Sequence, residues 1–561
     1  MFGANLDSDL IRPKSGQTTD VIVRYKTQPT AQHHQRVTGR GGRTLHQFNN
    51  VPMGHYAVTP EALADLENNP DVESVSPNRS LSATDDHADY STNFLPLDSY
   101  YNDTLHAAKG AGIGIAIIDS GINVGHPNFM QWASSSVSRV VYSETFVAGA
   151  AASDTGDQYG HGTHVAGIAA GVDNVIAGLP NATRWFYGIA MDANIINLKV
   201  LDKNGNGTDA SVIAGINRAI ALKSTYNIRV INLSLGRPIA VSYKNDPLCQ
   251  AVEAAWKAGI VVVVAAGNNG RYAATNGYGT IIAPGNDPFV ITVGAVNDKA
   301  DTDRTNDVIT TYSSKGPTAI DHIAKPDLVA AGNRIVSYQS PGAALPTAFP
   351  ANLLTNNQFN ATGNTAVSPY YLTLSGTSMA APFVSGSAAM LIDGAIRKGQ
   401  AITPDIIKAR LMKTAWRGFT ATMSTYDPVS AKTYTANHDL FTIGAGQVDI
   451  WAAYNDTSTG TGLATSPSVS YNSVSKTVQM NLNSTGATSV IWGTNVIWGT
   501  NVIWGTSILS GTNVIWGTSV IWGTSTTTGF NVIWGTSVPA AASALSTTAA
   551  ESLSLAGNGE N

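Results

Sequence analysis

The sequence lacks the features that mark several large protein classes. Its 561 residues include one cysteine, Cys249, so neither an internal disulfide nor a cluster of thiolate metal ligands can form. Charged residues make up 13% and the net charge is −5, which gives no electrostatic basis for binding nucleic acid or an anionic membrane. No uninterrupted apolar run reaches the roughly 18 residues of a transmembrane helix. The opening MFGANLDSDLIRPKSG has no apolar core of signal-peptide length, so we expect either that a signal was removed or that export uses another route.

The remaining composition predicts a large folded protein. With 43% hydrophobic residues the chain can bury a sizeable core and holds more than one domain. Residues 20–84 alternate strand-like VIVRY and HYAV with the helical pattern TPEALADLENNP, which predicts a small α+β unit after a leader remnant at 1–19. Residues 85–455 alternate apolar strands such as IGIAIID with helices, which predicts an α/β fold with a mostly parallel sheet flanked by helices. Residues 456–488 have the Ser, Thr, Gly and Asn content of a linker.

A six-residue repeat follows this linker at 489–537. NVIWGT and its variants keep tryptophan in a strict register, at Trp492, Trp498, Trp504, Trp516, Trp522 and Trp534. An even period places every tryptophan on one face of an extended strand and also suits a hexapeptide β-helix. Two interpretations stay open: an adhesive or glycan-stacking surface, or a Trp ladder packed on itself or on the body. Residues 538–561 are rich in Ala and Ser and are predicted to be disordered.

Four polar residues stand where apolar strands end or helices begin. Asp119 ends the strand IGIAIID, and Asn268 follows the strand VVVVAAG. His161 heads the helix pattern HGTHVAGIAAG, and Ser378 heads the helix pattern of LSGTSMAAPFVSG. Taken singly, the first two are typical turn residues and Ser378 is a typical N-cap. Because functional sites of open α/β sheets form at the carboxyl ends of the strands, these side chains are candidates for one site.

The two histidines of HGTH raise a second hypothesis, a metal site. Zinc-binding helices carry two histidines at i and i+4 with a glutamate between them. His161 and His164 are spaced i, i+3 with no carboxylate inside. We therefore favour a hydrogen-bonded core histidine at position 164, and we keep a metallopeptidase as a third functional hypothesis.

Together the four motifs closely resemble those of the subtilisin-like serine proteases, the subtilases. DSG, HGTH, AAGN and GTSMAAP occur in that family's order, and the resemblance covers about residues 85–455. It implies an Asp119, His161, Ser378 triad in which His161 takes the proton of the serine hydroxyl and Asp119 holds the ring. Asn268 and the backbone N–H of Ser378 would bind the oxyanion. Pro382 is expected in the first turn of the Ser378 helix, where no N–H is needed.

The resemblance also implies how protein or peptide substrates bind. Two extended edges would flank the bound peptide as neighbouring strands, Ser234-Leu235-Gly236 and Ala265-Ala266-Gly267. Pairing through the backbone depends little on sequence, so we expect a broad endopeptidase. Either Ile282 or Ala283 would line the pocket for the P1 side chain and restrict its size.

Other expectations concern maturation, ions and location. HYAVTPEALADLENNPDVESVSPN resembles the family's inhibitory propeptide, so we expect a self-inhibited zymogen that is cut between Ser80 and Tyr90. Asn128 stands where many subtilases carry a calcium-binding Asp, so that site is expected to be missing; structural calcium elsewhere cannot be assigned, and the chemistry needs no cofactor. The stretch from Tyr338 to Thr373 is longer than in compact bacterial members, as a surface loop near the cleft or a substrate-shaping insertion. Family resemblance implies secretion. The alternative function is an idle subtilase-fold scaffold that binds through its Trp repeats.

Overall fold

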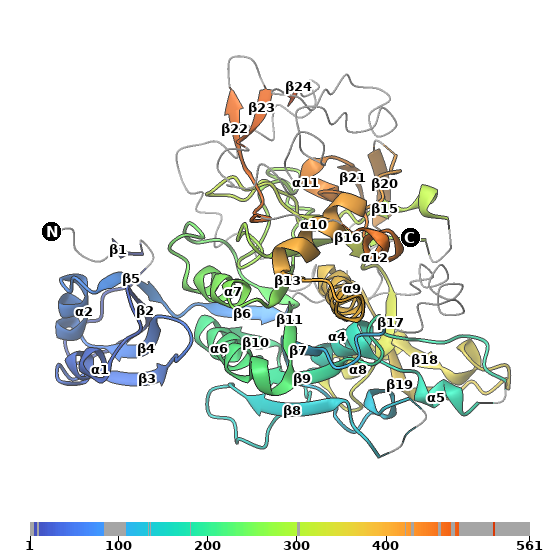
Figure 1. Cartoon of the computed structure of the whole chain (residues 1–561), viewed down its shortest axis with the longest axis horizontal. Helices are drawn as coiled ribbons and strands as arrows, with labels where there is room; N and C mark the ends of the chain where they lie inside the picture. The colour runs from blue at the N-terminus through green and yellow to red at the C-terminus, as the bar shows by residue number, and fades with distance from the viewer. Residues whose placement is uncertain are drawn as a thin grey trace.

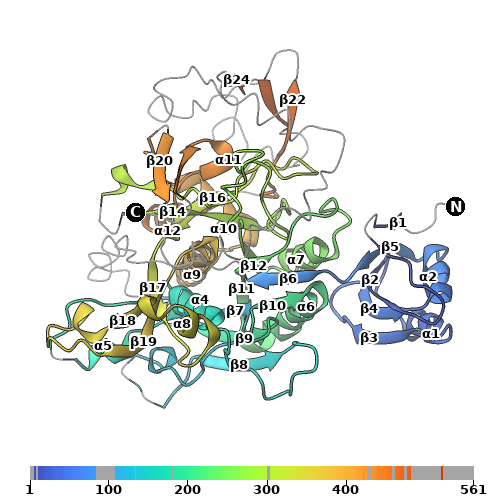
Figure 2. The same ribbon diagram turned by 180° about the vertical axis from the view of Figure 1, so that it is seen from behind.

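A computed structural model describes most of the chain outside the repeats. The described residues are 5–7, 10–83, 108–132, 134, 136–179, 181–299, 303–420, 422–427, 431–457, 462–472, 477–481 and 520–521. Of the predicted repeat block only Val520 and Ile521 are among them, as strand β24, so both interpretations of the Trp register stay predictions, as does disorder at 538–561. A small N-terminal unit, dark blue in Figure 1, stands beside a much larger body, and Figure 2 shows the pair from behind.

The N-terminal unit has the predicted α+β composition. Two helices pack on a five-stranded sheet of order β1-β5-β2-β4-β3. Its elements are β1 (Asn5–Leu6), β2 (Thr19–Tyr25), α1 (Ala31–Thr38), β3 (Arg43–Gln47), β4 (Met53–Val58), α2 (Pro60–Glu67) and β5 (Val72–Pro77). Val21, Val23 and Tyr25 on β2 pack into the unit's own core, whereas Ile22 between them belongs to the core of the body. Because successive strand residues face opposite sides, one face of the sheet is covered by helices and the other docks on the body.

The N-terminal boundary of this unit differs from the prediction. β1 pairs in parallel with β5, with Leu6 opposite Val75. Leu6 and Leu10 pack against the unit's core, and the buried carboxylate of Asp7 accepts a hydrogen bond from Arg79 at 2.7 Å. Describing residues 1–19 as a leader remnant is therefore wrong, because part of this segment completes the sheet and covers apolar surface.

The body contains the predicted α/β sheet. Its strand order is β15-β14-β13-β11-β7-β9-β8, with β16 also beside β14, and every described pair is parallel except β14 with β15. The strands are β7 (Gly114–Asp119), β8 (Val140–Thr145), β9 (Asn194–Lys199), β11 (Ile228–Leu233), β13 (Val261–Ala265), β14 (Ile291–Asn297), β15 (Val308–Ile309) and β16 (Leu328–Ala331). All residues of β7 and β13 are buried, as expected for central parallel strands covered on both faces.

Two pairs of helices cover the faces of this sheet (Figure 1). α4 (His161–Ala170) packs on α9 (Thr377–Arg397), and α6 (Asp209–Tyr226) packs on α7 (Pro247–Lys257). By length and composition α9 could cross a membrane, but 94% of its apolar window is buried inside the protein, as in the core helix of a globular domain. The shorter helices of the body are α5 (Asn174–Ala177), α8 (Ala344–Ala348), α10 (Pro404–Thr414), α11 (Leu440–Ile443) and α12 (Ile450–Asn455).

The remaining strands form smaller sheets. β6 (Ser80–Ala83) lies between β10 (Asn206–Thr208) and β12 (Leu235–Gly236). A second sheet has the order β17-β19-β18, and two antiparallel pairs lie toward the C-terminus. Their bounds are β17 (Ile335–Tyr338), β18 (Leu353–Thr355), β19 (Val367–Leu374), β20 (Thr422–Asp427), β21 (Lys432–Asn437), β22 (Ser468–Asn472) and β23 (Thr477–Asn481).

The long segment from Tyr338 to Thr373 is not a surface loop. Tyr338, Phe359 and Tyr371 are at most 1% exposed and pack together, with ring centroids 5.1 Å apart for Phe359 and Tyr371. With α8, β18 and most of β19 the segment has its own secondary structure and adds to the main core. That it shapes substrate binding stays a prediction.

The predicted linker is wrong for residues 464–469, which are packed into the body. The Ser466 hydroxyl donates to Asp327 Oδ1 at 2.5 Å and accepts from Lys408 Nζ at 2.9 Å. Lys408 and Asp327 are fully buried, and burial lowers the pKa of Lys408 to about 7. Ala324 N–H also donates to the carbonyl of Pro467 at 2.8 Å. A Ser-rich composition suggested a linker, but here the serine satisfies buried charged groups.

Ending the chain at Thr457 should therefore destabilise the body. Removing Ser466 leaves Asp327 and Lys408 short of a buried partner, so we expect a loss of about 3 kcal/mol or more in the free energy of unfolding. Urea unfolding of chains ending at Thr457 and at Asn481 measures this loss, because the second keeps the packed segment and lacks the repeats. Equal midpoints for the two chains would show that residues 462–469 contribute nothing.

Candidate active site

Asp119 and His161 meet at the carboxyl edge of the sheet. Asp119 is the last residue of β7 and is 1% exposed; its Oδ1 accepts from the backbone N–H of Ser120 at 2.7 Å. His161 is the first residue of α4, and its Nδ1 lies 2.7 Å from the same Oδ1. In the neutral ring this bond assigns the proton to Nδ1, which makes Nε2 the proton acceptor.

Glycines permit this close approach. Gly121 has a φ of +107°, a conformation that strains any other residue. A β-carbon on Gly162 would lie 2.2 Å from the carbonyl oxygen of Gly121. The first turn of α4 can therefore touch the turn after β7 only because both positions lack a side chain.

Ser378 is the second residue of α9, not its N-cap. The N-cap is Gly376, whose φ of +144° turns the chain into the helix. Ser378 is fully buried, and its Oγ donates to the carbonyl of Ser234 at 3.3 Å. As a first-turn residue its backbone N–H has no partner within the helix and lies at the positive end of the helix dipole.

Pro382 lies deeper in α9 than predicted. It is the sixth helical residue, in the second turn, so its missing N–H leaves the carbonyl of Ser378 without its usual helical donor. That carbonyl accepts instead from the Ser234 hydroxyl at 2.8 Å. Because of the proline, a second hydrogen bond joins Ser378 to Ser234, in addition to the one from the Ser378 hydroxyl.

The amide of Asn268 is fixed by its oxygen. Oδ1 accepts from the backbone N–H and the hydroxyl of Thr377, both at 3.0 Å, and that hydroxyl accepts from Gly267 N–H at 3.1 Å. Nδ2 is buried, and no acceptor for it is found among the described residues. A buried donor without an acceptor costs stability, so the amide is held ready to donate beside the residue that precedes Ser378.

His164 is a core histidine, as predicted. Its Nε2 lies 3.0 Å from the carbonyls of both Ile335 and Leu372, and burial lowers its pKa to about 3. Because the rings of His161 and His164 bond to different elements, their observed contacts do not suit a shared metal. Within the described ranges no group of three or more His, Cys, Asp or Glu side chains is arranged to hold an ion.

The Asn128 position does not fit a calcium ion. The Asn128 amide nitrogen donates to Asp173 Oδ1 at 3.1 Å, and its oxygen accepts from Val175 N–H at 2.9 Å. The hydroxyl of Tyr371 donates to the same Asp173 oxygen at 2.5 Å, and burial raises the pKa of Asp173 to about 6. The carboxylate is thus occupied by N–H and O–H donors, which a cation could not replace without leaving them unpaired.

A peptide strand already lies along one of the two predicted edges. β6 pairs antiparallel with β12, with Ala83 opposite Leu235 and Ser82 opposite Gly236. The edge on its other side is β10, where Ser82 lies opposite Asn206. β6 does not pair with Ala265-Ala266-Gly267, whose first residue ends β13 inside the central sheet, so an edge for a bound substrate there stays a prediction. The edge at Asn206–Thr208 was missed because NGNGTD has the composition of a turn.

Ile282 fills the space between the two segments that were predicted as edges. A β-carbon on Gly236 would lie 2.5 Å from Ile282 Cδ1, and one on Gly267 would lie 2.9 Å from Ile282 Cγ2. Ala283 instead pairs through its backbone with Arg237, at 2.8 and 3.0 Å. Of the two candidates for restricting the P1 pocket, only Ile282 has a side chain in this space.

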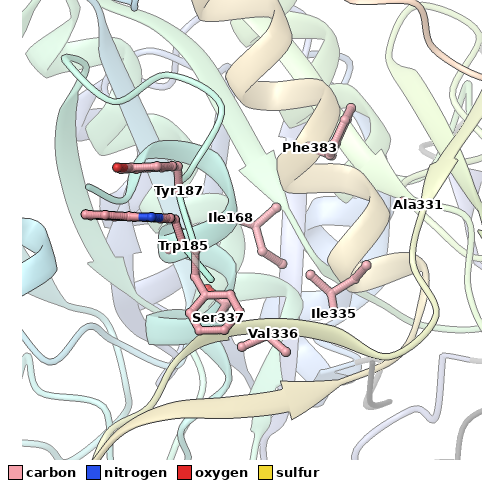
Figure 3. A pocket seen from close by; sticks show the side chains of 10 residues that line it. Ile168, Trp185, Tyr187, Ala331, Ile335, Val336, Ser337 and Phe383 are labelled. Carbon is pink, nitrogen blue, oxygen red and sulfur yellow. The ribbon is translucent and has the colours of Figure 1, made fainter. Parts of the chain in front are cut away.

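A separate small cavity is lined by residues of α4, β17 and α9 (Figure 3). Its volume is about 60 Å³, and Ile168, Val336 and Phe383 are among the residues that line it. Trp185 and Tyr187 also line it, and their stacked rings have centroids 5.7 Å apart. None of the four candidate residues lines this cavity.

Comparisons with known proteins identify the family and the fold of this chain. Residues 110–446 match the Subtilase family, Peptidase S8. The chain is 32% identical over 372 residues to serine protease AprX of Bacillus subtilis (strain 168), which covers 65% of this chain and 74% of that protein. It is 32% identical over 307 residues to subtilisin DY of Bacillus licheniformis, covering 55% and 85%. The crystal structure of fervidolysin from Fervidobacterium pennivorans matches with a TM-score of 0.55 at 21% identity over 82% of this chain; the chain spans 64% of that protein.

Proposed function

Because this chain belongs to the subtilase family of serine endopeptidases, we propose that it hydrolyses peptide bonds through an acyl-enzyme, with Asp119, His161 and Ser378 as its triad. The observation that carries the proposal is the 2.7 Å hydrogen bond between His161 Nδ1 and Asp119 Oδ1. It lies at the start of α4, the helix that packs on α9, which carries Ser378. It leaves Nε2 as the base that a serine nucleophile requires.

Each residue then has one task. His161 takes the proton of the Ser378 hydroxyl as the oxygen attacks the substrate carbonyl, and later gives it to the leaving amine. Asp119 holds the ring and stabilises the imidazolium form. Asn268 Nδ2 and the backbone N–H of Ser378 donate to the oxyanion, where fixed donors stabilise charge without reorganising.

The idle scaffold is the second candidate. It would have no use for a buried Asn268 Nδ2 that lacks an acceptor among the described residues, or for a buried imidazole–carboxylate pair, both of which cost stability. A fluorophosphonate probe separates the two, because the protease labels at Ser378 and the scaffold does not. The metallopeptidase hypothesis predicts instead that a chelator abolishes the chemistry.

Substitutions at the site should separate nucleophile, base and oxyanion donor. Ser378→Ala or His161→Ala should abolish most turnover, because triad members act as a unit. Asn268→Leu should lower kcat by about 10²–10³, the magnitude known for the oxyanion amide of subtilisin itself. Steady-state hydrolysis of a small peptide substrate measures both effects. Near wild-type activity in Ser378→Ala would refute the triad assignment.

The N-terminal unit is proposed to be an inhibitory propeptide. β6, its direct continuation, occupies the groove between β10 and β12. The preceding residues bond to the start of α6: Asp209 N–H donates to the Arg79 carbonyl and Ala210 N–H to Asn78 Oδ1, each at 2.8 Å. Ser378 and His161 have no exposed surface in this state. The strand between β10 and β12 and the buried site residues support a self-inhibited zymogen. Broad specificity and secretion are proposed from the family alone.

Self-cleavage is expected immediately after Thr84, which lies outside the described residues. Leu235 pairs with Ala83, and Ser234, one residue earlier, is the residue whose carbonyl accepts from Ser378. If that antiparallel register continued by one residue, the residue after Ala83 would lie opposite Ser234. N-terminal sequencing should find a mature chain that begins at Asp85, while Ser378→Ala stays full length. A cut that persists in Ser378→Ala free of other proteases would contradict the maturation scheme.

Ile282 should limit the P1 residue to small side chains. Replacing it in Ile282→Gly empties the space beside Gly236 and Gly267, so kcat/KM for a peptide with Phe at P1 should rise by about 10-fold or more relative to Ala at P1. The Ala substrate serves as the internal control for folding and chemistry. An unchanged ratio would show that Ile282 does not face the P1 side chain.

A further inference from the structure

A buried carboxylate outside the proposed triad lies in the loop just before α4. Asp157 is 5% exposed, and among the described residues it makes no salt bridge. Its charge is satisfied by hydrogen bonds alone, and burial still raises its pKa. Burying a carboxylate without a cationic partner is costly even when it accepts hydrogen bonds, which calls for a reason specific to this location.

The hydrogen bonds of Asp157 reach both sides of the Asp119–His161 pair. Oδ1 accepts from the Ser120 hydroxyl at 2.8 Å and from Gly160 N–H at 2.7 Å. Oδ2 accepts from the N–H and the hydroxyl of Thr163, at 2.8 and 2.6 Å. Ser120 follows Asp119, and Gly160 and Thr163 flank His161. One carboxylate therefore joins the end of β7 to the first turn of α4.

The hydroxyls in this network extend the same connection. The Ser120 hydroxyl accepts from Gly162 N–H at 3.0 Å while it donates to Asp157. The Thr163 hydroxyl accepts from Asn123 N–H at 2.9 Å while it donates to Asp157. Because both hydroxyls donate to Asp157, their orientations are set, and the turn after β7 cannot move without breaking bonds to α4.

The charge of Asp157 has a second consequence. His161 stands at the N-terminus of α4, where the helix dipole disfavours a positive ring. Asp157 accepts from the N–H groups of this terminus, so its negative charge offsets that effect where imidazolium must form. The other ionisable groups around it are Asp119 on β7, and His161 and His164 on α4. Earlier in the same loop, Asp154 Oδ1 forms a salt bridge with Lys199 Nζ at 3.0 Å. The insertion adds the Ser340 hydroxyl, which donates to the Asp157 carbonyl at 2.7 Å.

We propose that Asp157 is a positioning residue for the hydrolytic reaction, which fixes Asp119 and His161 relative to each other and supports the protonated ring electrostatically. This inference rests on the proposed triad. It requires Asp157 to act in two separable ways, through the geometry of its hydrogen bonds and through its charge.

The test compares full-length Asp157→Asn with Ser120→Ala and with the control Asp173→Asn. Asp173 is likewise buried and hydrogen-bonded, but it contacts no triad residue. Asp157→Asn should lower kcat by about 10–100-fold with little change in KM, since small misplacements of reacting groups cost rates of this order. Losing the negative charge disfavours imidazolium, so the acid limb of kcat/KM against pH should move to lower pH. Asp157→Glu keeps the negative charge, so its acid limb should lie closer to that of the unsubstituted protein than the acid limb of Asp157→Asn does.

Ser120→Ala keeps the charge and removes one link, so kcat should fall while the acid limb stays in place. It also decides the geometric part if Asp157→Asn does not fold, because wild-type kcat in folded Ser120→Ala would overturn the proposal. So would a folded Asp157→Asn with wild-type kcat, or one whose activity falls only with its folded fraction and whose acid limb is unshifted, as in Asp173→Asn. Failure of the proposed function is a different result, namely a Ser378→Ala chain that remains active.

Discussion

The hydrogen bond between Asp119 and His161 can form only if a strand end and a helix start touch. β7 lies between β9 and β11 at the centre of a parallel sheet, and its carboxyl end leads directly to the glycine turn at Gly121. α4 reaches that turn because Gly162 has no side chain to collide with it. The position of the His161 ring, the loop that carries Asp157 and the packing of α4 on α9 all depend on this one contact.

At Ser378 and Asn268, hydrogen bonds join segments that are far apart in the chain. Pro382 removes a helical donor, and the Ser378 carbonyl turns to Ser234 instead. Thr377 holds the Asn268 oxygen and leaves its nitrogen as a buried donor. Such arrangements reduce stability locally and persist because the surrounding core is closely packed. They are the arrangements expected where charge develops and fixed dipoles must already be in place.

Segments outside the four motifs contribute buried residues to the folded protein. The insertion between β17 and α9 supplies buried aromatic rings, and residues 464–469 supply a hydroxyl to a buried lysine–aspartate cluster. At the other end, Leu6 and Leu10 complete the N-terminal unit. Composition misjudged residues 464–469, because a serine is as suitable for satisfying buried polar groups as for remaining in solvent.

The sequence by itself determined the alternation of strands and helices and the α/β class, because periodicity is encoded by near neighbours. Its motifs, through their resemblance to those of the subtilases, indicated the four candidate residues Asp119, His161, Asn268 and Ser378. It also indicated that His164 belongs to the core. Only the tertiary structure decided that Asn206–Thr208 is the second edge beside β6, that Ile282 fills the gap between Gly236 and Gly267, and that Asp157 joins β7 to α4. Those relations link residues far apart in the chain, and no local pattern records which distant groups the packing of a core will bring within hydrogen-bond distance.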